Sequence, residues 1–260
     1  QSAYYSKEAQ LVAEEGERAE KTDEGGFNLG EETRDAILGK GMSEFSKWAL
    51  YAEDDTGYGV IIDYGMGNLL SVQRAFEKCG SDAVIIDNPL DLREAEHIVL
   101  PGVGAFPDAM NNLRDGGWIE ELNRAVLEKE TPILGICLGM QLLAERGYEV
   151  CECEGLGYIP GEIVRFEQTQ AKERIPHVGW NDIEKRVETP LFDGIEDGTN
   201  YYFVHSYHFK VRDEENIAAV TPYCGEFVSA VAKDHIVGTQ FHPEKSQKAG
   251  FRLIKNFLAM

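Results

Sequence analysis

The sequence Gly135-Ile136-Cys137-Leu138-Gly139-Met140-Gln141 determines the fold class more sharply than any other stretch of this 260-residue chain. It begins in the apolar run 132–136, which is typical of a strand buried on both faces, and it continues into a predicted helix over 138–146. A strand that turns directly into a helix leaves no room for side chains beside the turn, so glycine is needed two positions before and after Cys137. We interpret the stretch as a nucleophile elbow with sulfur in place of a hydroxyl.

Cys137 stands at the start of the predicted helix, where free N–H groups and the helix dipole favour a thiolate. The alternative is an inert buried cysteine, since free cysteine is among the most buried residue types. The two flanking glycines favour the nucleophile.

A thiolate that transfers acyl groups needs a base and a group that orients the base. The candidates lie in Gln240-Phe241-His242-Pro243-Glu244, at the end of a predicted strand far downstream of the cysteine. Glu244 could hold one ring nitrogen of His242 while the other faces the sulfur. An isolated histidine is more often a hydrogen-bonded structural residue, but His-x-Glu after a strand, together with an elbow cysteine, favours function.

Short apolar strands alternate with amphipathic helices from residue 58 to about residue 146. This alternation predicts an α/β fold with a mostly parallel sheet and helices on both faces. In the second half, strand-like runs follow each other closely and predict antiparallel hairpins at one edge of that sheet. These runs are 161–167, 200–210, 217–221, 227–232 and 236–241. We therefore expect one domain over 58–260.

Residues 1–57 differ from the rest because they carry 14 acidic and 6 basic residues. The polar stretch 14–30 cannot bury enough apolar area to offset its ordering entropy. We expect an acidic N-terminal extension that is flexible or loosely docked, and we assign no chemistry to it.

The composition excludes several classes of partner. A net charge of −21 repels phosphate backbones and anionic lipid, so we expect no nucleic-acid or membrane partner. No apolar run approaches the ~20 residues that span a bilayer. The five cysteines have no framework spacing and predict reduced thiols in a cytoplasmic protein. Cys151 and Cys153 lack a second pair, so we expect no metal and no cofactor.

The turn Pro101-Gly102-Val103-Gly104 follows the third predicted strand, and its glycines could let backbone N–H groups face a developing oxyanion. Glycine-rich turns follow many strands, so this pattern is not specific by itself. The aromatic run 201–208 either lines a polar pocket or is simply a strand. Trp180, in Pro176-His177-Val178-Gly179-Trp180-Asn181, is either a core residue or an interface anchor.

Five motifs in this order resemble the class I (triad) glutamine amidotransferases, and among them the glutaminase subunits of imidazole glycerol phosphate synthase. The resemblance runs from about residue 59 to the C-terminus and implies a flavodoxin-like fold. The motifs are Asp63-Tyr64-Gly65-Met66-Gly67-Asn68, Leu100-Pro101-Gly102-Val103-Gly104, Gly135-Ile136-Cys137-Leu138-Gly139-Met140-Gln141, Pro176-His177-Val178-Gly179-Trp180-Asn181 and Gln240-Phe241-His242-Pro243-Glu244-Lys245-Ser246.

The resemblance implies hydrolysis of L-glutamine to glutamate and ammonia through a thioester on Cys137, with His242 moving protons and Glu244 orienting it. It also implies roles for three further groups of residues. The oxyanion site would come from Gly102, Val103, Gly104 and Leu138. Glutamine would be held by Gln141, Ser206 and Tyr207. A partner subunit would be faced by Trp180, Tyr202 and Lys245.

The partner that the resemblance implies is a (βα)8-barrel synthase subunit, which would form a heterodimer with this chain and receive its ammonia through a tunnel. The products would be imidazole glycerol phosphate and aminoimidazole carboxamide ribotide, so the pathway would be histidine biosynthesis. The stretches 204–209, 225–230 and 245–251 look more like a paralogous branch that supplies ammonia for surface-polysaccharide sugars. A non-catalytic binding module on the same fold, or a cysteine hydrolase of another amide, also stays open.

Overall fold

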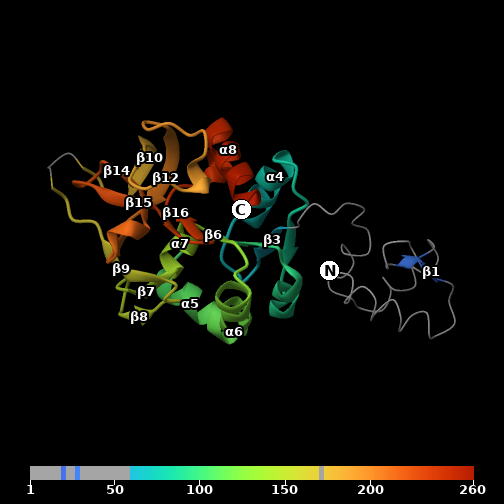
Figure 1. Cartoon of the computed structure of the whole chain (residues 1–260). Coiled ribbons are helices and arrows are strands. Elements are labelled where there is room, and N and C mark those ends of the chain that lie inside the picture. The colour runs from blue at the N-terminus through green and yellow to red at the C-terminus, as the bar shows by residue number, and fades with distance from the viewer. Residues whose placement is uncertain (1–18, 22–26, 30–58, 170–172) are drawn as a thin grey trace. The chain divides into compact units, whose positions relative to one another are not determined.

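The computed structural model describes residues 19–21, 27–29, 59–169 and 173–260 (Figure 1). The chain divides into two units, residues 1–54 and 55–260. In the first unit, β1 (Ala19–Lys21) pairs antiparallel with β2 (Phe27–Leu29). The rest of the expected extension over 1–57 lies outside the described residues, so its docking stays a prediction.

A parallel sheet forms the centre of the second unit. Its strands lie in the order β4-β3-β5-β6-β16, and each neighbouring pair is parallel. All residues of β3, β6 and β16 are buried, as expected for apolar strands covered on both faces. The bounds are β3 (Gly59–Ile62), β4 (Val84–Ile86), β5 (His97–Leu100), β6 (Ile133–Ile136) and β16 (Ile236–Thr239).

Helices cover both faces of this sheet. In Figure 1, α4 (Leu69–Lys78) and α8 (Gln247–Leu258) lie on one side, and α5 (Phe106–Asp115) and α6 (Trp118–Asn123) lie on the other. The buried residues of α8 fall on one stripe at helical spacing: Gly250, Leu253, Ile254 and Phe257. Among the described residues, no helix is long and apolar enough to cross a membrane.

Beyond β16 the sheet continues through strands that are mostly antiparallel. β15 (Phe227–Lys233) pairs with β16, and the order then runs β13-β9-β7-β8, with β14 attached to β15 and β11 attached to β14. The bounds are β7 (Ala144–Gly147), β8 (Cys153–Glu154), β9 (Ile159–Arg165), β11 (Glu184–Lys185), β13 (Tyr207–Val211) and β14 (Ile217–Thr221). A separate two-stranded ribbon pairs β10 (His177–Asp182) with β12 (Asn200–His205). The predicted fold class, a mostly parallel sheet with antiparallel strands at one edge, is confirmed.

Several boundaries differ from the sequence prediction. The predicted helix over 138–146 is wrong beyond Leu142, where α7 (Leu138–Leu142) ends and β7 begins. The backbone of β7 is instead paired with β9 and β8, an arrangement that helical periodicity cannot reveal. The single run 200–210 is two strands that separate at Ser206 and enter different sheets. Helix α5 and strand β10 were not predicted.

Candidate functional site

The predicted elbow is present at the carboxyl end of β6. Cys137 has φ 55° and ψ −108°, a strained conformation that ends the strand and starts α7. A Cβ on Gly139 would lie 1.7 Å from the Leu100 carbonyl oxygen, and one on Gly135 would lie 2.7 Å from the Gly139 carbonyl oxygen. The structural reason predicted for both glycines is therefore confirmed, since neither position has room for a side chain.

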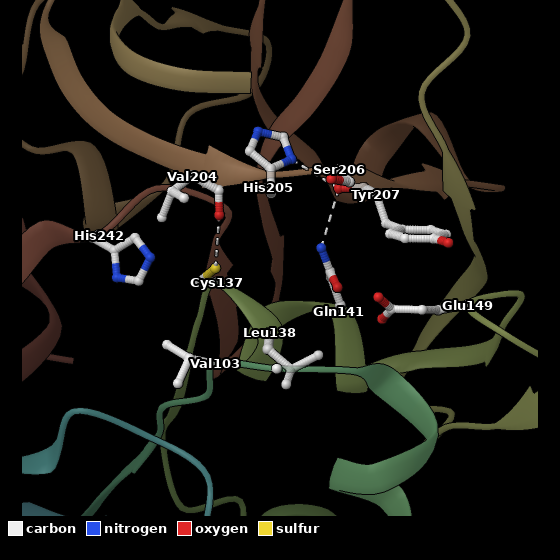
Figure 2. A pocket seen from close by; sticks show the side chains of 11 residues that line it. Val103, Cys137, Leu138, Gln141, Glu149, Val204, His205, Ser206, Tyr207 and His242 are labelled. Atoms are coloured by element: carbon white, nitrogen blue, oxygen red, sulfur yellow. Dashed lines mark hydrogen bonds between the residues drawn. The ribbon is translucent and has the colours of Figure 1, made fainter. Parts of the chain in front are cut away.

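The sulfur of Cys137 lies in a cavity of about 310 Å³ (Figure 2). Cys137 is only 7% exposed, and its N–H donates to the Thr239 carbonyl oxygen at 2.8 Å. The Gln240 side-chain amide donates to Sγ at 3.7 Å, and the Val204 carbonyl oxygen lies 3.9 Å from Sγ. The sulfur is thus fixed from two sides, by the segment after β16 and by the end of β12.

His242 follows β16 and lines the same cavity. Its Nδ1 lies 2.8 Å from the Glu244 carboxylate, and its buried Nε2 has no hydrogen-bond partner among the described residues. Figure 2 shows the imidazole beside the Cys137 sulfur, with a ring nitrogen facing it. Burial lowers the pKa of His242, but its interactions with Cys137 and Glu244 outweigh burial and raise the pKa to about 10. The imidazole is therefore held as a cation at neutral pH.

The turn after β5 forms another wall of the cavity. Val103, Gly104 and Leu138 line the cavity around the sulfur. Gly102 is not among the residues that line this cavity, and it has no room for a side chain, because a Cβ there would be 2.5 Å from the Tyr64 hydroxyl and 3.0 Å from the Leu138 Cβ. The Tyr64 hydroxyl donates to the Pro101 carbonyl oxygen at 2.8 Å and so holds the start of this turn.

The residues expected to hold the substrate meet on the opposite wall. Gln141, Ser206 and Tyr207 all line the cavity. The Gln141 side-chain amide donates to the Tyr207 carbonyl oxygen at 3.2 Å and to Gln240 Oε1 at 2.9 Å. Helix α7 and the β12–β13 corner are thereby joined across the cavity floor.

The expected partner-facing residues also gather in one place. The rings of Trp180 and Tyr202 lie 6.0 Å apart, and the Lys245 ammonium lies 5.8 Å from the centre of the Tyr202 ring. Trp180 is 49% exposed. The Tyr202 carbonyl oxygen accepts the His242 N–H at 2.9 Å, so this surface connects directly to the cavity.

Sequence reasoning missed three residues at the site. Glu149 lines the cavity and accepts the Phe106 N–H at 2.8 Å, but it lies beyond the misassigned end of the helix after Cys137. Gln240 was visible only as part of the motif that contains His242. His205 lines the cavity from the aromatic run 201–208, whose pattern gave no sign of which side chains face inward.

The site can be compared with known proteins. The chain matches the family described as "Glutamine amidotransferase class-I" over residues 60–260. The solved structure of a glutamine amidotransferase superposes with a TM-score of 0.61 at 19% identity, covering 77% of this chain and 99% of that one. At this identity the likeness concerns the fold alone.

Curated relatives are much more similar in sequence. "Imidazole glycerol phosphate synthase subunit HisH 1" of Campylobacter jejuni is 51% identical over 200 residues, which cover 77% of this chain and 98% of the relative. "Imidazole glycerol phosphate synthase subunit HisH" of Geobacter sulfurreducens is 50% identical over 201 residues, which cover 76% and 96%. With the family match, the shared fold and this identity over nearly the full length of its relatives, the chain belongs to the class-I glutamine amidotransferase family.

Proposed function

We propose that this protein is the glutaminase subunit of an imidazole glycerol phosphate synthase and hydrolyses L-glutamine to glutamate and ammonia. The observation that carries the proposal is the pairing of an elbow cysteine with the His242–Glu244 pair in one cavity. Relatives about half identical to the chain bear the name of that synthase's subunit.

In the first step, the Cys137 thiolate attacks the side-chain amide carbon of glutamine and forms a C–S bond. The raised pKa of His242 keeps a proton on the imidazole at neutral pH. His242 gives that proton to the amide nitrogen, the C–N bond breaks, and ammonia leaves. Glu244 holds Nδ1 and stabilises the imidazolium.

In the second step, water opens the glutamyl thioester. The now neutral His242 accepts a proton from that water, the C–S bond breaks, and glutamate leaves with the thiolate restored. Backbone N–H groups of Gly102, Val103, Gly104 and Leu138 are the proposed donors to the oxyanion that develops in both steps. Val103, Gly104 and Leu138 line the cavity, which supports three of these four positions.

Glutamine carries an α-carboxylate and an α-ammonium group that the cavity must recognise. We assign Gln141, Ser206 and Tyr207 to substrate binding, because all three line the cavity next to the sulfur. The Glu149 carboxylate lies in the same wall and is suited in charge to an α-ammonium group.

The ammonia is proposed to pass to a (βα)8-barrel synthase subunit that makes imidazole glycerol phosphate and aminoimidazole carboxamide ribotide for histidine biosynthesis. Trp180, Tyr202 and Lys245 are the proposed contact surface. Trp180 is an exposed aromatic residue beside the path to the cavity, which suits an interface anchor.

The test is to purify the full chain with each candidate barrel partner and to measure glutamate release with the barrel ligand present and absent. We expect slow turnover alone, faster turnover with the histidine-pathway barrel, and none with Cys137→Ala in a variant that still binds the barrel. Activation only by the barrel of a surface-sugar gene set would assign the protein to that pathway instead. Wild-type glutamate release by Cys137→Ala would remove the nucleophile assignment.

The catalytic unit is proposed to be residues 58–260, with 1–57 as an accessory extension. The family match begins at residue 60, which supports this boundary. Deleting 1–57 should leave glutaminase turnover unchanged; loss of soluble, active protein would show that the extension is part of the working unit.

A further inference from the structure

A chain of hydrogen bonds between buried histidines lies behind the wall of the cavity formed by the β12–β13 corner. His177 on β10 and His205 on β12 are direct partners in the antiparallel register of the ribbon. His177 Nδ1 lies 3.1 Å from His205 Nε2, and both residues are less than 10% exposed. This contact between the two imidazoles takes no part in the proposed chemistry at Cys137.

The hydrogen bond between His205 and Tyr207 determines which imidazole nitrogens donate and which accept. His205 Nδ1 lies 2.8 Å from the Tyr207 carbonyl oxygen, which can only accept, so Nδ1 carries the proton. In a neutral imidazole the other nitrogen is then an acceptor. His205 Nε2 therefore accepts from the Nδ1–H of His177.

The contacts of His177 with Asn181 give the same donor and acceptor assignment independently. The Asp182 N–H donates to Asn181 Oδ1 at 2.9 Å, which fixes the orientation of the Asn181 amide. Its Nδ2 then donates to the Pro222 carbonyl oxygen at 3.2 Å and lies 3.4 Å from His177 Nε2. His177 Nε2 is therefore the acceptor and Nδ1 the donor, in agreement with the assignment from His205.

This series of hydrogen bonds ends on the segment from Val204 to Tyr207, which faces the proposed substrate. Val204 and Tyr207 present their carbonyl oxygens to the Cys137 sulfur and to the Gln141 amide, and Ser206 lines the cavity between them. Figure 2 shows the imidazole of His205 and its hydrogen bond to the Tyr207 carbonyl oxygen within this segment. A loss of the bond from His177 would leave a buried acceptor on His205 unpaired and would free the corner to move.

We infer that His177 and His205 are positioning residues for glutamine: as a directed, uncharged pair they hold the Val204–Tyr207 corner at the distance that the substrate needs. This inference rests on the proposed glutaminase function. The neutral state is supported by burial, which lowers the pKa of His177 to about 4 and is the largest cause of a pKa of about 3 for His205. The hydrogen bond to Tyr207 raises the pKa of His205, and the imidazoles of His177, His208 and His242 lower it further.

Two substitutions of His177 separate hydrogen bonding from packing. The imidazole packs against Phe203 and Tyr223, with ring centres 5.0 and 4.0 Å away. His177→Phe keeps a ring there but removes the donor to His205. His177→Asn loses the ring, but its amide nitrogen takes the place of Nδ1 and keeps the donor.

Glutaminase kinetics of the full chain with its barrel partner provide the measurement. We expect His177→Phe to raise the KM for glutamine about tenfold with kcat within about twofold, and His177→Asn to restore most of the KM. Equal KM values for wild type and His177→Phe, or a better KM for His177→Phe than for His177→Asn, would overturn the inference while leaving the glutaminase function intact. A wild-type complex without glutaminase activity would overturn both.

A second measurement does not depend on the folding of a variant. ¹⁵N NMR of the wild-type imidazoles should show His177 and His205 as neutral Nδ1–H tautomers at pH 7, and still neutral at pH 5.5. A protonated imidazole or an Nε2–H tautomer at either residue would contradict the directed chain.

Discussion

His242 and His205 line the same cavity, yet they differ in charge. His242 has a pKa raised to about 10 and is a cation at neutral pH, whereas His205 has a pKa lowered to about 3 and is neutral. Burial acts on both in the same direction, toward the neutral form. The difference therefore comes from the groups around them: Cys137 and Glu244 raise the pKa of His242, whereas the neighbouring imidazoles lower the pKa of His205 further.

The Nδ1 of His242 faces a carboxylate, and the Nδ1 of His205 faces a backbone carbonyl. An ionised partner can compensate the loss of hydration of an imidazolium, whereas the Tyr207 carbonyl raises the pKa of His205 by less than burial lowers it. The environment of His242 is suited to proton transfer. The environment of His205 is suited to a hydrogen bond with a fixed donor and acceptor. Two identical side chains that line one cavity are thus suited to different tasks by the groups they contact.

The largest loss of activity is expected from substitution of the charged histidine, His242. His242→Ala should lower glutaminase kcat by about 10⁴-fold or more, because proton transfer to the leaving nitrogen is lost. Steady-state assays of the full chain with its partner would measure it, with His177→Phe as the control that should leave kcat almost unchanged. Equal kcat losses for both variants would erase the proposed distinction between them.

Glu244→Gln should lower kcat less, by about 10²-fold, since an orienting group usually contributes less than the base itself. The variant keeps an oxygen near Nδ1 but removes the negative charge, so the pKa of His242 should fall toward that of His205. The pH dependence of kcat/KM reports this shift. An unchanged profile would mean that Glu244 does not set the charge of His242.

The neutral histidines should make the fold sensitive to acid. Their folded-state pKa values, about 4 for His177 and about 3 for His205, lie below the unfolded value near 6.5. Below pH 6.5 the unfolded chain binds more protons, so stability falls with decreasing pH, by up to about 1.4 kcal/mol per pH unit for each histidine until its folded pKa is reached. Urea unfolding of wild type and His177→Phe at pH 7 and 5 tests this: the variant should lose less stability on acidification.

His242 should have the opposite pH dependence. Its folded-state pKa lies above the unfolded value, so its stabilisation is fully present below about pH 6.5 and is lost as the pH rises toward 10. The stability difference between wild type and His242→Gln should therefore shrink between pH 6.5 and 10. A difference that stays constant over this range would show that His242 is neutral in the folded chain.

Local sequence was sufficient for the elbow, since two glycines around a cysteine at a strand–helix junction have a steric cause within a few residues. It was also sufficient for the parallel strands, whose apolar runs are continuous. It was insufficient for Glu149, because the helix after Cys137 ends at Leu142 through sheet pairing with distant strands. It was equally insufficient for His177 and His205, whose pairing depends on the register between β10 and β12.

The sequence by itself determined the fold class and the candidate nucleophile and base, because turn sterics and hydrophobic periodicity act over short distances along the chain. The tertiary structure alone decided which histidine is charged and which is neutral. The charge of a buried imidazole depends on the group brought to each ring nitrogen, and for His205 those groups come from different strands and turns of the folded chain.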